Sequence, residues 1–319
     1  MEQAEDAVVT ASGMAAISAV LFAHAKQGAR WGVSNVLYGM TYSLLVNDIS
    51  RMGVKIEWFD PTRPETLREL VSKGGKFDLL YFETISNPIA RLAALPEIVD
   101  IARQSNSITV VDNTFASPWN VCPIPLGVDF VVESGTKYLN GHTDIICGMV
   151  AAKKETLLPV WRQMTRLGGC LDPDPAYLWD RGLRTFPLRI IQATANAKAL
   201  ADWLKTRSDI EAVFYPGVSE PLPDWLPEGG AVLSFRVMRG DAHADSVLRH
   251  LKVVKAATSL GGVETLASNP YNTSHVQFTS EQRAEMGILP GTIRLAVGTE
   301  ALADLKSDLE QAIISTDEC

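Results

Sequence analysis

Short apolar segments rich in β-branched residues alternate with helical patterns through the first half of this 319-residue chain. The β-rich segments are Ala7–Thr10, Arg30–Val36, Lys55–Phe59, Leu79–Phe82, Ile108–Val111, Phe130–Val132 and Gly148–Ala152. Helical patterns separate several of them, over Met14–Ala25, Ser43–Met52, Pro64–Lys73 and Leu95–Gln104. Strands that alternate with helices form βαβ units, so the pattern predicts an α/β fold with a mainly parallel seven-stranded sheet, covered on both faces.

The second half of the chain has a different organisation. After Pro187, residues 188–207 show the pattern of one long helix, and FYPG at 214–217 and the proline-rich residues 219–230 predict loops. The segments 231–238, 243–254, 292–297 and 302–313 then predict a strand, a helix, a strand and a helix. We therefore expect a large domain over 1–187 and a smaller C-terminal α/β domain over 188–319, joined by the long helix.

Composition excludes several classes of protein. The net charge of -8 argues against a nucleic-acid binder, because phosphate contacts require a basic surface. The first 20 residues carry acidic side chains where a signal peptide carries basic ones, and His24 and Lys26 interrupt the apolar stretch well before it could span a membrane. The four cysteines form no CxxC pair, which predicts neither a metal site nor a disulfide framework. A cytoplasmic protein of enzyme size is expected.

The familiar motifs of dehydrogenases, NTPases, serine hydrolases and zinc proteases are absent from the sequence. Ligands of parallel α/β sheets bind at the carboxyl ends of the strands, so polar residues there are the candidates. Asp112 ends the segment ITVVD and is followed by Asn113 and Thr114. This sequence is also common in turns, but a carboxylate at a strand end can keep a heterocyclic nitrogen protonated.

The next predicted strand leads to Ser134, Thr136 and Lys137. Two hydroxyl groups beside a lysine suit a phosphate, and lysine is the residue that forms Schiff bases with aldehydes. A lone lysine at a strand end is usually a solvated surface charge. Together with Asp112, however, Lys137 matches the residue pair that pyridoxal phosphate (PLP) requires.

Two further features support a site for a planar phosphate compound. Ser12, Gly13 and Met14 lie between a predicted strand and a predicted helix, where free backbone N–H groups bind phosphate. Ser12 also fits an ordinary helix N-cap. Tyr38 offers a flat ring for stacking, although a tyrosine buried in the core at a strand end is an equal alternative.

These residues lie in stretches that resemble one known family over nearly the whole chain. The matching stretches are SGMAAI (12–17), LYGMTY (37–42), FETISNP (82–88), VVDNTFASP (110–118), ESGTKYLNGHTD (133–144), RGLRT (181–185), SLGGVETL (259–266) and TIRLAVGTE (292–300). The chain is identified by them as a member of the PLP-dependent enzymes of cysteine and methionine metabolism, which include cystathionine γ-synthase, cystathionine γ- and β-lyase and methionine γ-lyase. The resemblance implies the type I fold of PLP-dependent transferases and pyridoxal 5'-phosphate as cofactor.

The resemblance also implies roles for individual residues, each transferred by its matching position. Lys137 would form the Schiff base with the cofactor, and Asp112 would contact its pyridine nitrogen. The other cofactor contacts would be Gly13, Met14, Ser134 and Thr136 at the phosphate, Tyr38 on the ring, Asn87 beside the phenolic oxygen, and Thr114. Tyr38 would assist proton transfer at the leaving group, and Asn87, Ser259 and Arg294 would contact the substrate. An ion pair with Glu264 or Glu300 is the alternative for Arg294.

The implied reaction is elimination or replacement at the γ- or β-carbon of a sulfur amino acid or an O-activated homoserine. The Tyr-Gly-x-Thr form of LYGMTY favours a γ-lyase or γ-synthase. A homoserine-ester sulfhydrylase and a cystathionine β-lyase are alternatives, as is a catalytically impaired homologue that acts as a subunit or binding partner. An aminotransferase of the same fold disagrees with ESGTKYLNGHTD. The family also implies a homo-oligomer, a dimer or a tetramer.

Some positions depart from the family pattern. The family's chains usually begin several dozen residues earlier, with a segment that reaches the neighbouring subunit's cofactor phosphate, so weaker cofactor retention is expected here. Met40 stands where glycine or cysteine is usual. Residues 218–230 and the sequence SNPYNTSH (268–275) also differ from the family, and we expect these differences to alter substrate specificity.

Overall fold

The computed structural model describes residues 1–273 and 279–315. The chain divides into two compact units, of which the first comprises residues 1–87, 92–140 and 144–183. The second unit comprises residues 88–91, 141–143 and 184–319. The domain boundary at residue 187 stays a prediction. Residues 274 and 275 of SNPYNTSH lie outside the described residues.

The first unit is built on a seven-stranded sheet with the strand order β1-β7-β6-β5-β4-β2-β3. Its strands are β1 (Asp6–Thr10), β2 (Arg30–Ser34), β3 (Lys55–Phe59), β4 (Leu79–Glu83), β5 (Ile108–Asp112), β6 (Phe130–Glu133) and β7 (Gly148–Ala152). Neighbours among β2 to β6 pair in parallel, whereas β7 runs antiparallel to both β1 and β6. The predicted mainly parallel sheet is confirmed, with strand ends displaced by two residues at most.

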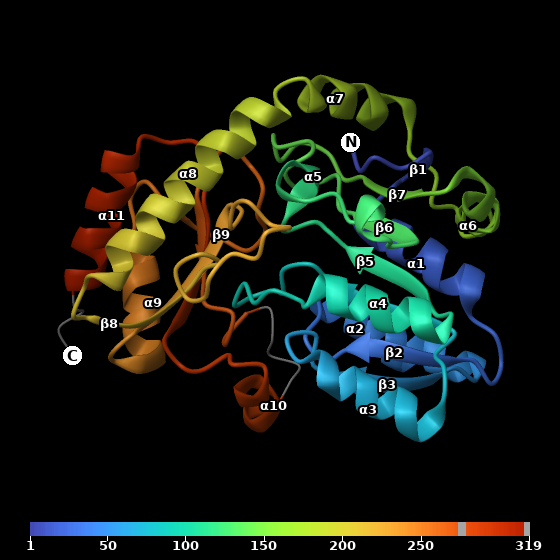
Figure 1. Ribbon diagram of the computed structural model, residues 1–319. Helices are drawn as coiled ribbons and strands as arrows, with labels where there is room; N and C mark the ends of the chain where they lie inside the picture. The colour runs from blue at the N-terminus through green and yellow to red at the C-terminus, as the bar shows by residue number, and fades with distance from the viewer. Residues whose placement is uncertain (274–278, 316–319) are drawn as a thin grey trace. The chain divides into compact units, whose positions relative to one another are not determined.

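Helices pack on this sheet because alternate side chains of the central strands point to opposite faces. On one face, Leu79 and Tyr81 of β4 share a core with side chains of α1 (Gly13–His24) and α6 (Lys154–Arg166). Leu80 and Phe82, one residue further along, are also fully buried. The helices α3 (Pro64–Gly74) and α4 (Leu95–Ser105) lie side by side and pack on β3 and β5 (Figure 1). Both faces of the sheet are therefore apolar and covered.

The segment after β2 differs from its prediction. One helix was expected over Ser43–Met52, but α2 begins at Gly39 and ends at Leu44, and a π-helix (Leu45–Ile49) and a 3-10 turn (Ser50–Met52) follow it. Gly53, with a φ of 83°, ends the segment in the left-handed conformation that favours glycine. Glycine and threonine in the first turn have weak helix propensity, which explains why the sequence pattern missed this turn.

The unit contains four further helical segments: α5 (Ser117–Asn120), a 3-10 turn (Ile124–Leu126), α6 and α7 (Pro173–Leu183). None of them was predicted. Pro159 lies inside α6, where a proline normally interrupts a helix, whereas the proline that begins α7 is at a position that helices favour.

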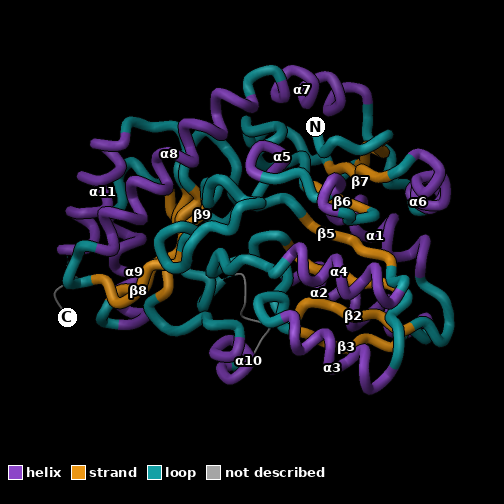
Figure 2. The backbone as a smooth tube through the Cα atoms, in the orientation of Figure 1, coloured by secondary structure: helices purple, strands orange, loops and turns teal. Residues whose placement is uncertain are grey.

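The second unit has its own five-stranded sheet, in the order β10-β11-β12-β9-β8. Figure 2 shows β8 and β9 of this sheet in orange. Its elements are α8 (Phe186–Lys205), β8 (Ile210–Phe214), β9 (Val232–Val237), α9 (Gly240–His250), β10 (Lys255–Ala256), β11 (Leu266–Ser268), α10 (Ser280–Glu285), β12 (Thr292–Ala296) and α11 (Leu302–Ile314). Leu200 of α8, Phe235 of β9 and Leu309 of α11 share one buried core. The long helix and the four predicted elements that follow it are present.

No helix within the described residues combines the length and apolar character needed to cross a bilayer.

Candidate active site

Three neighbouring parallel strands of the first unit end on acidic residues. Glu83 ends β4, Asp112 ends β5 and Glu133 ends β6. Glu83 and Asp112 lie opposite each other in the register of the sheet, and Asp112 lies opposite Val132, the residue before Glu133. Like charges this close disfavour ionisation, and burial away from water adds to that effect. The carboxyl edge of the sheet is therefore a place where protons and cations are held.

Glu83 fixes the two segments that flank the edge. Its Oε1 accepts a hydrogen bond from the backbone N–H of Tyr38 at 2.7 Å, and its Oε2 accepts one from the backbone N–H of Asn87 at 3.3 Å. Burial and the nearby charge of Asp112 raise the pKa of Glu83 to about 8. We did not predict this residue, although a glutamate that ends the apolar segment LLYFE was a visible signal.

The flanking residues differ in exposure. The side chain of Tyr38 is 43% exposed and precedes α2, so its ring is accessible for stacking and does not belong to the core. Asn87 is buried, with 5% of its surface exposed. Met40 is 55% exposed two residues after Tyr38.

Asp112 is half-buried and is held by the residues that follow it. Its Oδ1 accepts a hydrogen bond from the backbone N–H of Thr114 at 3.0 Å. The Thr114 hydroxyl in turn accepts one from the backbone N–H of Ser134 at 2.9 Å, which ties the ends of β5 and β6 together. Burial raises the pKa of the Asp112 carboxyl, and the bonds from Thr114 partly oppose this. A cation beside Asp112 would relieve the cost of its charge.

The N-terminus of α1 lies directly against this edge. A Cβ atom added to Gly13 would stand 2.9 Å from both Cβ and Oγ of Ser134, and one added to Gly148 would stand 2.8 Å from Cα of Gly13. Ser12 caps the helix by accepting the backbone N–H of Ala15 at 3.0 Å. The N–H groups of Gly13 and Met14, at the first two positions of the helix, have no acceptor among the residues that the structure describes. Such groups attract anions.

Thr136 and Lys137 lie in the turn that follows β6. The Thr136 hydroxyl donates to the carbonyl of Cys147 at 3.0 Å and accepts the Cys147 backbone N–H at 3.0 Å, so its hydrogen is already in use. The backbone N–H of Lys137 donates to the carbonyl of Ser134 at 3.0 Å. This bond closes a tight turn that carries Ser134, Thr136 and Lys137 at the same strand end.

The predicted carboxylate contacts lie in the second unit. Arg294 belongs to β12, is 5% exposed, and donates from Nη2 to the carbonyl of Ser259 at 2.7 Å. Ser259 has a φ of 89°, which is strained for a residue with a side chain. The two glutamates considered as alternative partners bond elsewhere: Glu264 accepts from the Thr143 hydroxyl at 2.9 Å and Glu300 from the Thr265 hydroxyl at 2.7 Å.

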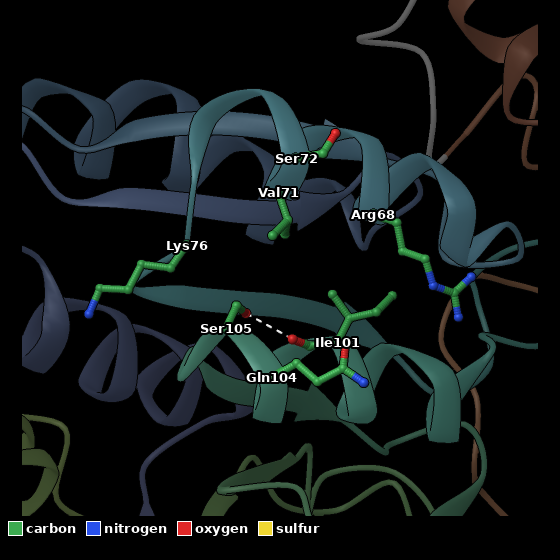
Figure 3. A pocket seen from close by; sticks show the side chains of 7 residues that line it. All are labelled: Arg68, Val71, Ser72, Lys76, Ile101, Gln104 and Ser105. Atoms are coloured by element: carbon green, nitrogen blue, oxygen red, sulfur yellow. Dashed lines mark hydrogen bonds between the residues drawn. The ribbon is translucent and has the colours of Figure 1, made fainter.

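A cavity of about 500 Å³ lies elsewhere in the first unit (Figure 3). Its lining side chains come from the helix layer: Arg68, Val71, Ser72, Lys76, Ile101, Gln104 and Ser105. Lys76 and Ser105 lie after α3 and at the end of α4, just before the amino ends of β4 and β5. This cavity therefore lies at the opposite edge of the sheet from Asp112 and Lys137, and no predicted site residue lines it.

Comparison with known proteins agrees with the geometry. A family model described as "Cys/Met metabolism PLP-dependent enzyme" matches residues 1–314. L-methionine gamma-lyase of Fusobacterium nucleatum subsp. nucleatum is 35% identical over 98% of this chain and 81% of its own length. Cystathionine beta-lyase of Lactococcus lactis subsp. cremoris is 35% identical over 95% of this chain and 80% of its own.

A solved structure shows the same likeness. Cystathionine gamma synthase from Xanthomonas oryzae pv. oryzae, in complex with aminoacrylate and cysteine, superposes with a TM-score of 0.93 at 33% identity. The match covers 98% of this chain and 82% of that chain.

The raised pKa of Glu83 predicts a pH-dependent stability. In the unfolded chain Glu83 titrates near 4.5 and in the folded chain near 8, so the folded state binds the extra proton. Glu83 thus contributes stability below pH 4.5 that is lost as the pH rises through about 8. We expect Glu83→Gln to flatten the fall in unfolding free energy over this window, measured by urea unfolding of the cofactor-free protein. Glu65→Gln, an exposed control in α3, should keep the wild-type slope, and an unchanged slope in Glu83→Gln would contradict the assignment.

The close approach of Gly13 to Ser134 predicts that Gly13→Ala is destabilising. The added Cβ would overlap Ser134, at a cost of about 1–3 kcal/mol in unfolding free energy. Ser134→Gly removes both atoms that lie at 2.9 Å, so the double variant should recover part of the loss. Urea unfolding of the two single variants and the double variant measures this coupling, and strictly additive effects would show that the overlap is absent.

Proposed function

We propose, because this chain belongs to the Cys/Met metabolism PLP-dependent enzyme family, that it eliminates or replaces the γ-substituent of a sulfur amino acid or of an O-activated homoserine. The observation that carries this proposal is the meeting of three features at one sheet edge. They are the half-buried carboxyl of Asp112, the turn that carries Lys137, and the N-terminus of α1 packed on Ser134.

The residues at this edge fit pyridoxal 5'-phosphate. Because Gly13 has no side chain, the first turn of α1 packs directly on Ser134, and the backbone N–H groups of Gly13 and Met14 can approach phosphate oxygens there. Ser134 adds a hydroxyl donor, whereas Thr136 would have to release Cys147 before its hydroxyl could donate to a phosphate. Asp112, whose pKa is raised by burial, is suited to a partner group that is itself protonated and positively charged.

The cofactor, when bound, withdraws electrons from the substrate through its protonated pyridine ring. Asp112 would hold the proton on the ring nitrogen, and Thr114 keeps the Asp112 carboxylate oriented. Lys137 would bond to the aldehyde carbon of the cofactor. The free Nζ of Lys137 would take the proton from Cα of the substrate and, in γ-chemistry, move a second proton at Cβ.

Two further residues would orient the reacting groups. The ring of Tyr38 would stack on the cofactor, and its hydroxyl would transfer a proton to or from the leaving group. Asn87 would donate its side-chain amide to the phenolic oxygen. Glu83 holds the backbone of both residues, so it would set their positions without touching the substrate.

The substrate α-carboxylate would bind Arg294 and Ser259. A guanidinium forms two parallel hydrogen bonds with a carboxylate, and the carbonyl of Ser259 already fixes Nη2 of Arg294. The strained backbone of Ser259 is consistent with a functional segment.

A γ-lyase or γ-synthase is our first choice because LYGMTY keeps the Tyr-Gly-x-Thr form. A homoserine-ester sulfhydrylase and a cystathionine β-lyase use the same Asp112 and Lys137 and differ in leaving group and nucleophile.

A homo-oligomer and a cytoplasmic location complete the proposal. Several apolar side chains between residues 40 and 58 are exposed, and they support the oligomer because contacts between proteins bury such side chains. They are Met40, Val46, Met52 and Trp58, each between 37% and 55% exposed.

The proposed function is tested with a panel of substrates. The protein with added PLP is incubated with cystathionine, methionine, cysteine and O-acyl-homoserines, each with and without a thiol, and the products are identified by mass spectrometry. We expect a 2-oxo acid and ammonia from elimination, or a new thioether from replacement. A protein that takes up no PLP and releases no product would overturn the proposal.

Lys137→Ala should abolish the reaction, because no other residue is proposed to bond to the aldehyde. It should also abolish borohydride-trapped cofactor on the chain, detected by peptide mass spectrometry. Lys55→Ala, an exposed lysine at the amino end of β3, is the matched control and should retain both properties. Wild-type turnover by Lys137→Ala would show that the assignment is wrong.

Arg294→Lys should weaken substrate binding without disturbing the cofactor. A lysine cannot form the paired hydrogen bonds of a guanidinium, so we expect KM to rise about tenfold or more while the absorption of bound PLP stays unchanged. Arg236→Lys, on neighbouring β9, serves as the control. An unchanged KM in Arg294→Lys would place the carboxylate site elsewhere.

A further inference from the structure

A pair of buried glutamates lies on the far side of the β5 and β6 strand ends. Glu2, from the segment before β1, and Glu133, the last residue of β6, are each 2% exposed. The two side chains interact with each other, and both interact with the side-chain amide of Asn113, which donates to Oε1 of Glu2 at 3.0 Å. Because side chains alternate along a strand and Val132 lies opposite Asp112, Glu133 points to the other face of the sheet from Asp112. The mechanism above does not use this pair.

One oxygen of each carboxyl has no donor. Oε2 of Glu2 and Oε1 of Glu133 are buried without a hydrogen-bond donor in the described part of the chain. A buried carboxylate oxygen without a donor is costly, and two charged carboxylates in contact are more costly still. One proton held between the two carboxyls supplies a donor and leaves the pair with a single negative charge.

Three other ionisable groups act on this pair in the described part of the chain. Asp112 acts on Glu133 from across the sheet, and the α-amino group of Met1 and the Cys122 thiol lie near Glu2. Burial raises the pKa of Glu2 and of Glu133, and the charge of Glu2 raises the pKa of Glu133 further. These directions agree with a proton held by the pair at neutral pH.

Asn113 connects the pair to the active site. Its Nδ2 donates to Oε1 of Glu2 at 3.0 Å and to the carbonyl of Val121 at 2.9 Å, while its Oδ1 accepts the Thr84 hydroxyl at 2.8 Å. Its backbone N–H donates to the carbonyl of Val132 at 3.0 Å and so continues the pairing of β5 with β6. Asn113 directly follows Asp112, so the hydrogen bonds of Asn113 also help to fix the backbone that carries Asp112.

We propose that Glu2 and Glu133 share one proton and, through Asn113, act as positioning residues that hold Asp112 against the ring nitrogen of the cofactor. This inference rests on the proposed function, because it assigns the ring nitrogen to Asp112. Removal of either carboxyl breaks the pair, and loss of the shared proton places a second charge close to Asp112. Both changes act on Asp112 indirectly, because neither Glu2 nor Glu133 is proposed to touch the cofactor.

The shared proton is tested in the protein without cofactor. Infrared spectra report the C=O stretch of protonated carboxyl groups, and we compare wild type with Glu2→Gln, Glu133→Gln and the control Glu5→Gln. Glu5 lies three residues from Glu2 but is exposed. We expect both pair variants to lose the intensity of one protonated carboxyl at a pH above the ordinary range of glutamate, and the control to keep it. Equal intensity in all four proteins would overturn the shared proton.

The positioning role is tested by PLP titration and by the pH dependence of the absorption of bound PLP. Glu133→Ala should weaken PLP binding about tenfold, because Glu2 is left buried without its partner. Glu133→Gln should restore the wild-type affinity at neutral pH, since its amide still donates to Glu2, and should lose the alkaline change that ionisation of the pair causes. If Glu133→Ala does not fold, Glu2→Ala provides the same test, because Glu2 lies outside the strands of the sheet.

The outcomes separate the two proposals. If wild type binds PLP and Lys137→Ala loses the covalent bond, but both alanine variants bind PLP with wild-type affinity and spectrum, the positioning role is wrong and the proposed function stands. If wild type binds no PLP, the proposed function and the positioning role both fail, and the infrared comparison still decides whether the proton is shared.

Discussion

The burial of three acidic residues at adjacent strand ends is the constraint on which this site depends. Unit charges a few ångströms apart interact strongly away from water, so Glu83, Asp112 and Glu133 cannot all be ionised without compensation. The chain compensates each one differently. Glu83 accepts two backbone N–H groups, Asp112 accepts Thr114 and is suited to a cationic ring, and Glu133 faces a second carboxyl. Of these three carboxyl groups, only Asp112 is placed so that a cationic ligand can stabilise its charge.

The same constraint explains why the surrounding segments are fixed by backbone contacts. Glu83 orders the segments of Tyr38 and Asn87 through their N–H groups, and Thr114 joins two strands through its hydroxyl. Gly13 brings the first turn of α1 against Ser134, where a larger residue would not fit. Side chains that are available for chemistry therefore sit on a backbone that other residues hold rigid, which is what precise placement of a cofactor requires.

The sequence was sufficient for the elements and residues whose signals are local. The strand segments of the large sheet, Asp112 at a strand end and the hydroxyls around Lys137 follow from periodicity and from the carboxyl-end rule. Glu2 and Asn113 did not follow, because they bond to each other across 111 positions of the chain. Glu83 was missed although its place at the end of LLYFE was a visible signal, and one of its two partners, Tyr38, is 45 positions away. Helix α6 was missed because Pro159 interrupts its pattern, although neighbouring packing retains the helix. Local sequence patterns thus predict the position of a side chain on its strand. Its protonation state depends on burial by residues that are distant in the chain.

The type of reaction must be determined by residues other than Asp112 and Lys137. Asp112 and Lys137 would activate any α-amino acid, since holding a ring proton and moving a Cα proton do not depend on the leaving group. Selectivity must therefore come from residues that shape the space around the leaving group and admit water or a thiol. Met40 is a candidate because it departs from the family pattern and is 55% exposed two residues after Tyr38. A bulky, flexible thioether there occupies volume that glycine would leave to the substrate. Exchange of Met40 for glycine is thus more informative about specificity than any change at Asp112 or Lys137.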